Sequence, residues 1–260
     1  MKTKIISICI LALCMLALSS LAEAQFSYSG SLDLDGSTTG TEDGYLTGTG
    51  TWNTGSTTSI SWDVSWNGTE QYVHYSYTFT YPSHDPSYFI FEVSQDFTSA
   101  NITNIKVDGI LLPYTDATPQ TFTYEVNTFS PDTNNYQTMP ESIYGIKIEN
   151  PQYADPSDGS VTITFDSTRM PTWGDFYARC GVRPEHTSGS TEWNSAWNTG
   201  FTTSDTDPSD PASNGSVDGT VTYSHLLVPD TVVVPEPVSS TLFVIGGAFL
   251  AGRRLMKKRK

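Results

Sequence analysis

Apolar and polar side chains alternate along short runs of this 260-residue chain, and this alternation restricts its fold more than any other feature. The run Val73–Phe79 shows it most clearly. Its apolar positions are Val73, Tyr75, Tyr77 and Phe79, and its polar positions are His74, Ser76 and Thr78. Successive side chains of a strand point to opposite faces, so the pattern indicates an antiparallel strand with one face buried. Between the two ends of the chain, no window of 12 or more residues shows a helical stripe.

β-rich runs recur between Gly, Pro, Asn and Asp residues. They predict strands at Phe26–Leu32, Tyr45–Trp52, Ser59–Trp66, Tyr72–Tyr81, Tyr88–Val93, Ile102–Val107, Phe122–Val126, Ile143–Ile148, Val161–Asp166, Phe176–Arg179 and Val217–Leu227. Turns are expected at Asp35-Gly36, Asp108-Gly109, Asp158-Gly159 and Asp218-Gly219. Many short strands separated by turns predict an all-β ectodomain, an antiparallel β-sandwich or a jelly-roll-like fold.

The beginning of the chain has the composition of a signal peptide. Lys2 and Lys4 precede the apolar run Ile5–Leu18, and Ala22-Glu23-Ala24 supplies the small residues of a cleavage site. We expect a signal helix at residues 1–24, export through the Sec translocon, and cleavage by signal peptidase between Ala24 and Gln25. A first transmembrane helix or a buried core helix is the alternative, and the shortness of the apolar run disfavours it.

The end of the chain combines a proline-rich motif, an apolar segment and a basic cluster, in that order. Val234-Pro235-Glu236-Pro237 precedes the apolar residues 238–252, and six of the 13 Lys and Arg residues lie in the last eight positions. Basic residues stay cytoplasmic, so we expect a transmembrane helix at 238–252 with Arg253 and Arg254 as its membrane stop. The tail 253–260 then lies in the cytoplasm and the ectodomain outside it. This span is below the ~20 residues of a comfortable one, which favours a temporary tether over a permanent anchor.

These three parts together resemble the PEP-CTERM sorting signal of Gram-negative bacteria. The resemblance covers residues 234–260 and implies that the chain is a substrate of an exosortase, a membrane-embedded enzyme that cuts near the Pro-Glu-Pro motif. It assigns no activity to the ectodomain. The two prolines fix φ and remove backbone donors, so Val234–Pro237 is expected to be extended and accessible.

The middle of the chain resembles an uncharacterised β domain that recurs in PEP-CTERM exoproteins. The segments that carry this resemblance are Val73–Thr80, Tyr88–Ser94, Tyr144–Lys147, Val161–Phe165 and Pro171–Arg179. It implies a single domain that ends near the sorting signal. We therefore expect a β ectodomain at residues 25–229 and a stalk with the Pro-Glu-Pro motif at 230–237.

The ectodomain is strongly acidic. With both targeting segments removed, 5 basic and 26 acidic residues remain, a formal charge of −21. A field of this sign repels phosphate backbones, which excludes nucleic acid as a partner. Cys180 is the only cysteine outside the signal peptide, so no internal disulfide is possible, and we expect a small buried residue rather than a nucleophile.

Aromatic and acidic residues supply the candidate binding positions. Trp62 and Trp66 share one strand face, which core packing explains as well as a sugar platform does. Trp193 and Trp197 lie in a loop-like region and are the better candidates for exposed glycan contacts. The acidic run around residues 205–210 departs from the EF-hand spacing, so we expect a solvated turn there. Its candidate Ca²⁺ ligands are Asp205, Asp207 and Asp210.

No catalytic motif is present. The spacings of His74, His84, His186 and His225 do not predict a zinc site, and there is no nucleophile elbow or phosphate-binding loop. We therefore expect no cofactor and no enzyme activity. The predicted function is that of an exported structural or adhesive protein of the cell surface, associated with exopolysaccharide. A carbohydrate-binding module and a polysaccharide-degrading enzyme are the alternatives.

Overall fold

The computed structural model describes residues 25–34, 44–53, 57–115, 120–132, 136–151, 159–180, 193–202 and 225–233. The expected signal helix, the sorting motif, the transmembrane segment and the basic tail lie outside these ranges. Within them, no helix has the length and hydropathy needed to cross a membrane.

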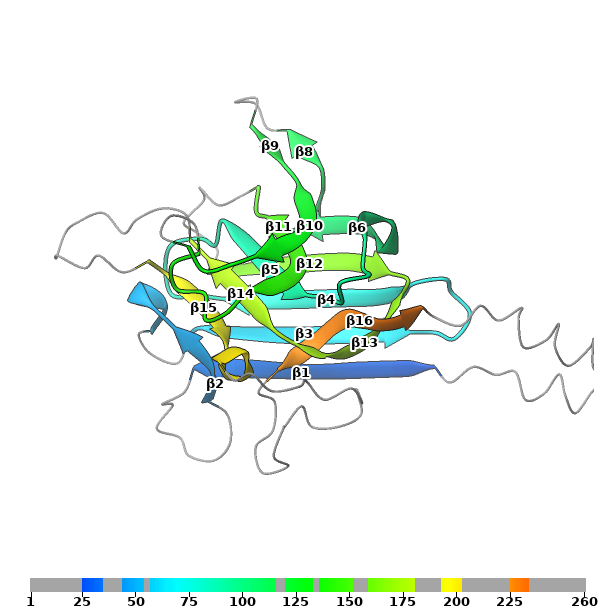
Figure 1. The fold of residues 1–260 in the computed structure, drawn as a ribbon, viewed down its shortest axis with the longest axis horizontal. Coiled ribbons are helices and arrows are strands. Elements are labelled where there is room, and N and C mark those ends of the chain that lie inside the picture. Colours follow the sequence, from blue (N-terminus) through cyan, green and yellow to red (C-terminus); the bar gives the residue numbers. More distant parts are fainter. Residues whose placement is uncertain are drawn as a thin grey trace, which may run out of the picture. The chain divides into compact units, whose positions relative to one another are not determined.

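Strands make up most of the described chain (Figure 1). Their bounds are β1 Phe26–Leu34, β2 Gly44–Gly48, β3 Ser59–Trp66, β4 Val73–Thr80, β5 Tyr88–Glu92, β6 Ile102–Val107, β7 Ile110–Leu111, β8 Tyr114–Thr115, β9 Thr121–Phe122, β10 Tyr124–Phe129, β11 Ile143–Glu149, β12 Ser160–Ser167, β13 Arg169–Gly174, β14 Phe176–Arg179, β15 Ser195–Asn198 and β16 Leu226–Val233. Three short 3₁₀ turns occur among them, at Gly50–Asn53, Ser99–Asn101 and Thr199–Thr202.

The chain divides into two compact units. In the smaller unit the described residues are 25–26 and 66–71. There the rings of Phe26 and Trp66 lie 5.9 Å apart, and Trp66 Nε1 donates a hydrogen bond to the Glu70 carbonyl at 2.8 Å. The larger unit comprises Ser27–Ser65 and Tyr72–Val233 and contains nearly all of the sheet.

Twelve strands form one curled, mixed sheet in the order β10-β11-β5-β14-β15-β2-β1-β3-β4-β12-β6-β7. The neighbours of β4, β5, β11, β12 and β14 are antiparallel, whereas β1 and β2 are parallel. The strands β13 and β16 form a separate antiparallel ribbon, as do β8 and β9. The predicted all-β class is confirmed.

The core lies where the inner face of β4 meets β5 and β14. The predicted alternation of β4 is confirmed, because Val73, Tyr75, Tyr77 and Phe79 are buried and the residues between them are not. The Tyr77 and Phe91 rings stack at 4.4 Å, and Phe79 contacts both Phe89 at 5.6 Å and Phe176 at 6.5 Å. β4 is not a neighbour of β5 or β14 in the sheet order, so these aromatic contacts join separate parts of the sheet, and they contribute beyond their buried area.

Three strands have the predicted bounds: β3, β6 and β14. The predicted strand Tyr45–Trp52 is too long, because β2 ends at Gly48 and a 3₁₀ turn begins at Gly50. Gly50 adopts a φ of +60°, a conformation that glycine allows at little cost, and the Asn194 side chain accepts a hydrogen bond from the Thr51 N–H at 2.8 Å. The predicted turn at Asp108-Gly109 is confirmed, with φ values of 47° and 82° between β6 and β7.

The end of the β domain differs from the prediction. The stalk expected from Asp230 onward is wrong for residues 230–233, because they belong to β16, which the sequence placed at Val217–Leu227. Thr231 and Val233 pair with Met170 and Arg169 of β13, a strand that was not predicted. Residues 217–224 lie outside the described ranges. The folded β structure therefore continues to Val233, the residue before the proline-rich segment Val234–Pro237.

Four tyrosines should resist ionisation in the native protein. Burial raises the pKa of Tyr77, Tyr88, Tyr136 and Tyr177 above the ordinary value of 10.0. Because the unfolded chain ionises first, their contribution to stability is complete below pH 10 and is lost as the pH rises above it. Absorbance at 295 nm should show fewer ionised tyrosines in the native protein than in denaturant above pH 10. Equal titration of all 14 tyrosines in both states would contradict this expectation.

Candidate functional site

The outer face of β3, β4 and β12 carries a regular array of polar side chains. Antiparallel pairing places these residues in rows across the three strands, because opposite residues share a face. The rows are Ser59, Thr80 and Ser160; Ser61, Thr78 and Thr162; Asp63, Ser76 and Thr164; and Ser65, His74 and Asp166. Nine of these twelve positions are Ser or Thr, and we call the array the hydroxyl grid.

The hydroxyl grid follows from the alternation that builds the core. In β4 and β12 every second residue is buried, so the residues between them face outward by default. Threonine favours strands because its branched side chain packs well on a pleated surface. Opposite threonines come close: the Thr78 and Thr162 hydroxyl oxygens lie 3.4 Å apart.

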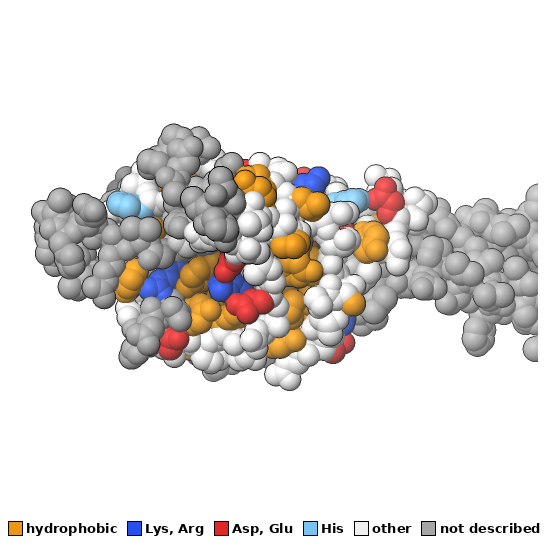
Figure 2. Space-filling model, turned by 90° about the horizontal axis from the view of Figure 1, so that it is seen from above, with side chains coloured by type: hydrophobic (Ala, Val, Ile, Leu, Met, Phe, Trp, Pro, Cys, Tyr) orange, Lys and Arg blue, Asp and Glu red, His pale blue; other side chains and the backbone are white. Residues whose placement is uncertain are grey.

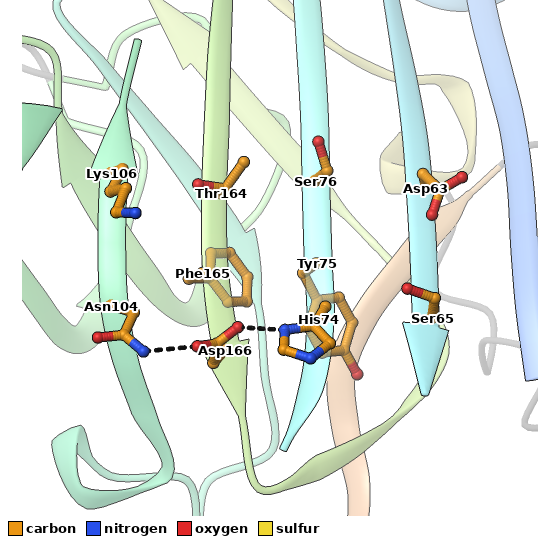
Figure 3. A pocket seen from close by; sticks show the side chains of 10 residues that line it. All are labelled: Asp63, Ser65, His74, Tyr75, Ser76, Asn104, Lys106, Thr164, Phe165 and Asp166. Carbon is orange, nitrogen blue, oxygen red and sulfur yellow. Dashed lines mark hydrogen bonds and ion pairs between the residues drawn. The ribbon is translucent and has the colours of Figure 1, made fainter. Parts of the chain in front are cut away.

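A groove of about 440 Å³ occupies one end of the hydroxyl grid. Figure 3 shows Asp63, His74, Asp166 and Lys106 among its lining side chains, which project from four neighbouring strands. His74 Nδ1 and Asp166 Oδ1 are 2.6 Å apart, and Asn104 Nδ2 donates to Asp166 Oδ2 at 2.6 Å (Figure 3). The Asp166 carboxylate therefore holds an imidazole on one side and an amide on the other.

A β-bulge in β6 brings Asn104 to this groove. The pairing of β12 with β6 shifts register between Thr164, which faces Lys106, and Asp166, which faces Thr103. Asn104 has a φ of 54°, in a region that Asn tolerates better than most residues. Both Ile102 and Ile105 are buried although three positions separate them, so the extra residue keeps the apolar side inward and directs Asn104 outward.

The groove has little net charge. Its ionisable side chains are Asp63, His74, Lys106 and Asp166. Elsewhere, on the face seen in Figure 2, blue and red groups lie next to one another among orange and white rather than forming one acidic field. Lys147 lies 3.1 Å from Glu125 and 3.7 Å from Glu149, so these charges are paired.

A second polar cluster is buried and serves the fold. Asp175 Oδ1 accepts a hydrogen bond from Asn198 Nδ2 at 2.6 Å and lies 3.2 Å from His225 Nδ1. Asn198 and His225 are fully buried, and the Asn198 side-chain oxygen accepts the Phe176 N–H at 2.9 Å. The cluster ties the starts of β14 and β16 to the end of β15.

The tryptophans mostly belong to the core. Those at positions 52, 62, 66, 173 and 197 are at most 8% exposed, so core packing is confirmed for Trp62 and Trp66. The expectation of an exposed glycan contact is wrong for Trp197, because it lies on β15 with its ring stacked on Tyr177 at 6.5 Å. Trp193 is half-buried, with the Arg179 guanidinium 4.2 Å from its ring centre.

The remaining candidates are Cys180 and the three aspartates of residues 205–210. Cys180 is buried, as expected. Asp205, Asp207 and Asp210 lie outside the described ranges. In the part of the chain that the structure describes, no group of three or more His, Cys, Asp or Glu side chains has the arrangement of a metal site.

The sequence prediction did not single out the groove. His74 and Asp166 are 92 residues apart, and no motif links them. Part of the signal was present, since His74 was expected on the polar face of its strand and Asp166 at the end of another predicted strand. The apolar residues Ile102, Ile105 and Val107 depart from strict alternation, a signal of an irregular strand that the prediction did not use.

Comparison with protein-family models, curated proteins and solved structures gave no match to this chain.

Proposed function

We propose that this protein is an exported structural or adhesive component of the cell surface, tethered in the inner membrane and then processed by an exosortase. The observation that carries the proposal is the order of parts at the end of the chain, with Val234–Pro237 before an apolar segment and Arg253-Arg254 after it. Together with the proposed signal peptide, this order supports a position of the acidic ectodomain outside the cytoplasm. Exopolysaccharide is its proposed partner at the surface.

The curled sheet supports an antiparallel β-sandwich or jelly-roll-like ectodomain. Its two halves, β10 to β2 and β1 to β7 in sheet order, share a core through the contacts of β4 with β5 and β14. Inner faces that interdigitate in this way are typical of sandwiches. Such a domain presents two outer faces, of which the hydroxyl grid is part of one.

A binding role fits the groove better than catalysis. The row Ser65, His74 and Asp166 has the residue types of a hydrolase triad, but acyl transfer also needs donors for the developing oxyanion. Along β3, β4 and β12 the backbone N–H groups are engaged in the ladders of the sheet, and the Asn104 amide already donates to Asp166. The polar outer face favours the carbohydrate-binding alternative over the polysaccharide-degrading one.

The sorting step is tested by mass spectrometry of the native protein from cells that contain an exosortase. We expect a mature chain that begins at Gln25 and ends near Pro235–Pro237. A Glu236→Ala variant should accumulate with its basic tail attached, whereas Ser239→Ala, just beyond the motif, should be processed normally. A mature wild-type chain that still ends at Lys260 would refute sorting by proteolysis.

A further inference from the structure

The hydroxyl grid and its groove have the chemistry of a surface for a neutral, polyhydroxylated chain, and we propose that this face binds an uncharged polysaccharide. The inference rests on the proposed function in one respect, since the ectodomain must reach the cell surface to meet such a polymer. It adds the ligand class and the residues that bind it.

Hydrogen-bonding capacity is the first argument. Each Ser or Thr hydroxyl offers one donor and two acceptors, and its proton rotates to suit a partner. A sugar hydroxyl has the same capacity, so a grid of hydroxyls can satisfy a chain of sugar rings in many registers. The outward Ser27, Ser29 and Ser31 of β1, which neighbours β3 in the sheet, extend the polar surface by another strand.

The groove provides fixed groups at the end of this adaptable surface. Asp166 holds both His74 and Asn104 through contacts of 2.6 Å, so these side chains are ordered before a ligand arrives. Ordering in advance lowers the entropy cost of binding. Lys106 and Asp63 lie in the neighbouring row and add one donor group and one acceptor group.

Charge and shape select the partner. Two carboxylates beside one lysine disfavour a polyanion, and the four rows contain no Trp, Tyr or Phe ring for stacking on a sugar. Each contact is therefore a modest hydrogen bond exposed to water. Useful affinity then requires many contacts along an extended ligand, which favours a polymer over a free sugar.

The test is affinity electrophoresis of the full chain in gels containing dextran or hydroxyethyl cellulose, which are uncharged, or alginate, which is anionic. The protein is kept in a detergent without a sugar head group, so that the detergent does not compete. We expect retardation by at least one uncharged polymer and not by alginate. The double variant Thr78→Val and Thr162→Val removes two central hydroxyls at nearly constant shape, and should bind about tenfold more weakly.

The matched control is Thr128→Val, an exposed threonine of β10 outside the hydroxyl grid, which should bind like the wild type. Binding of the double variant equal to wild type, retardation by neither uncharged polymer, or equal retardation by alginate would each overturn the proposal. Self-association that the double variant abolishes would assign the face to a second copy instead, and also overturn it. The masses of the mature termini test sorting separately, so failure of one proposal is distinguishable from failure of the other.

Discussion

Replacing Phe79 with alanine should destabilise the protein by about 3–5 kcal/mol, the usual cost of removing a buried phenylalanine ring. Phe79 is fully buried, and its ring lies 5.2 Å from Trp52 and 5.6 Å from Phe89. The change therefore opens a cavity among rings from both halves of the sheet. Since domains are stable by only about 5–15 kcal/mol, this loss should be visible as a large fall in the urea midpoint.

The control for this substitution is its neighbour Thr78, which faces outward on the same strand. Thr78→Ala should change the free energy of unfolding by about 0.5 kcal/mol or less, as surface substitutions do. Urea unfolding followed by circular dichroism compares the two variants directly. Similar losses at both positions would contradict the assignment of inner and outer faces to β4.

Replacing Asp175 with alanine should cost about 2–4 kcal/mol, because two buried donors lose their acceptor. Asn198 and His225 are fully buried, and each lies within hydrogen-bonding distance of Asp175 Oδ1. The Phe176 N–H depends on the orientation of the same Asn198 side chain. The starts of β14 and β16 should therefore loosen together.

Hydrogen exchange measures this effect locally, and thermal unfolding measures it globally. We expect faster exchange in β14 and β16 of the Asp175→Ala variant than in β4. Asp63→Ala, an exposed aspartate of the hydroxyl grid, serves as the control and should leave both the exchange rates and the unfolding midpoint nearly unchanged. Unchanged exchange in β14 and β16 would show that the buried cluster contributes little.

The bounds of strands were predicted best where one face of the strand is buried and the other faces solvent. In β3, β4 and β12 alternation is strict, and the predicted bounds are within one residue of those observed. β13 and β15 were missed because nearly all their residues are buried, so no alternation marks them. The break after Gly48 depends on Asn194, a residue 146 positions away, which local patterns do not reveal.

The groove could be predicted only in part. The alternation of its strand predicted that His74 faces outward. It did not predict that Asp166 of β12 lies beside it. The pairing of β4 with β12 spans a long connection, so no short turn fixes which strands meet or in which register. The connection between β1 and β2 is short, but the sequence predicted antiparallel strands, so their parallel contact was missed. The bulge directs Asn104 to Asp166 only because β6 pairs with β12, a pairing that local patterns do not reveal.

The placement of the tryptophans also determines what an optical signal from this protein can report. Five indole rings are shielded from water, and the sixth lies against the Arg179 guanidinium. Intrinsic fluorescence should therefore follow melting of the interior through a red shift of the emission. A polymer lying across the serine and threonine rows would touch none of these fluorophores, so its arrival has to be followed by another method.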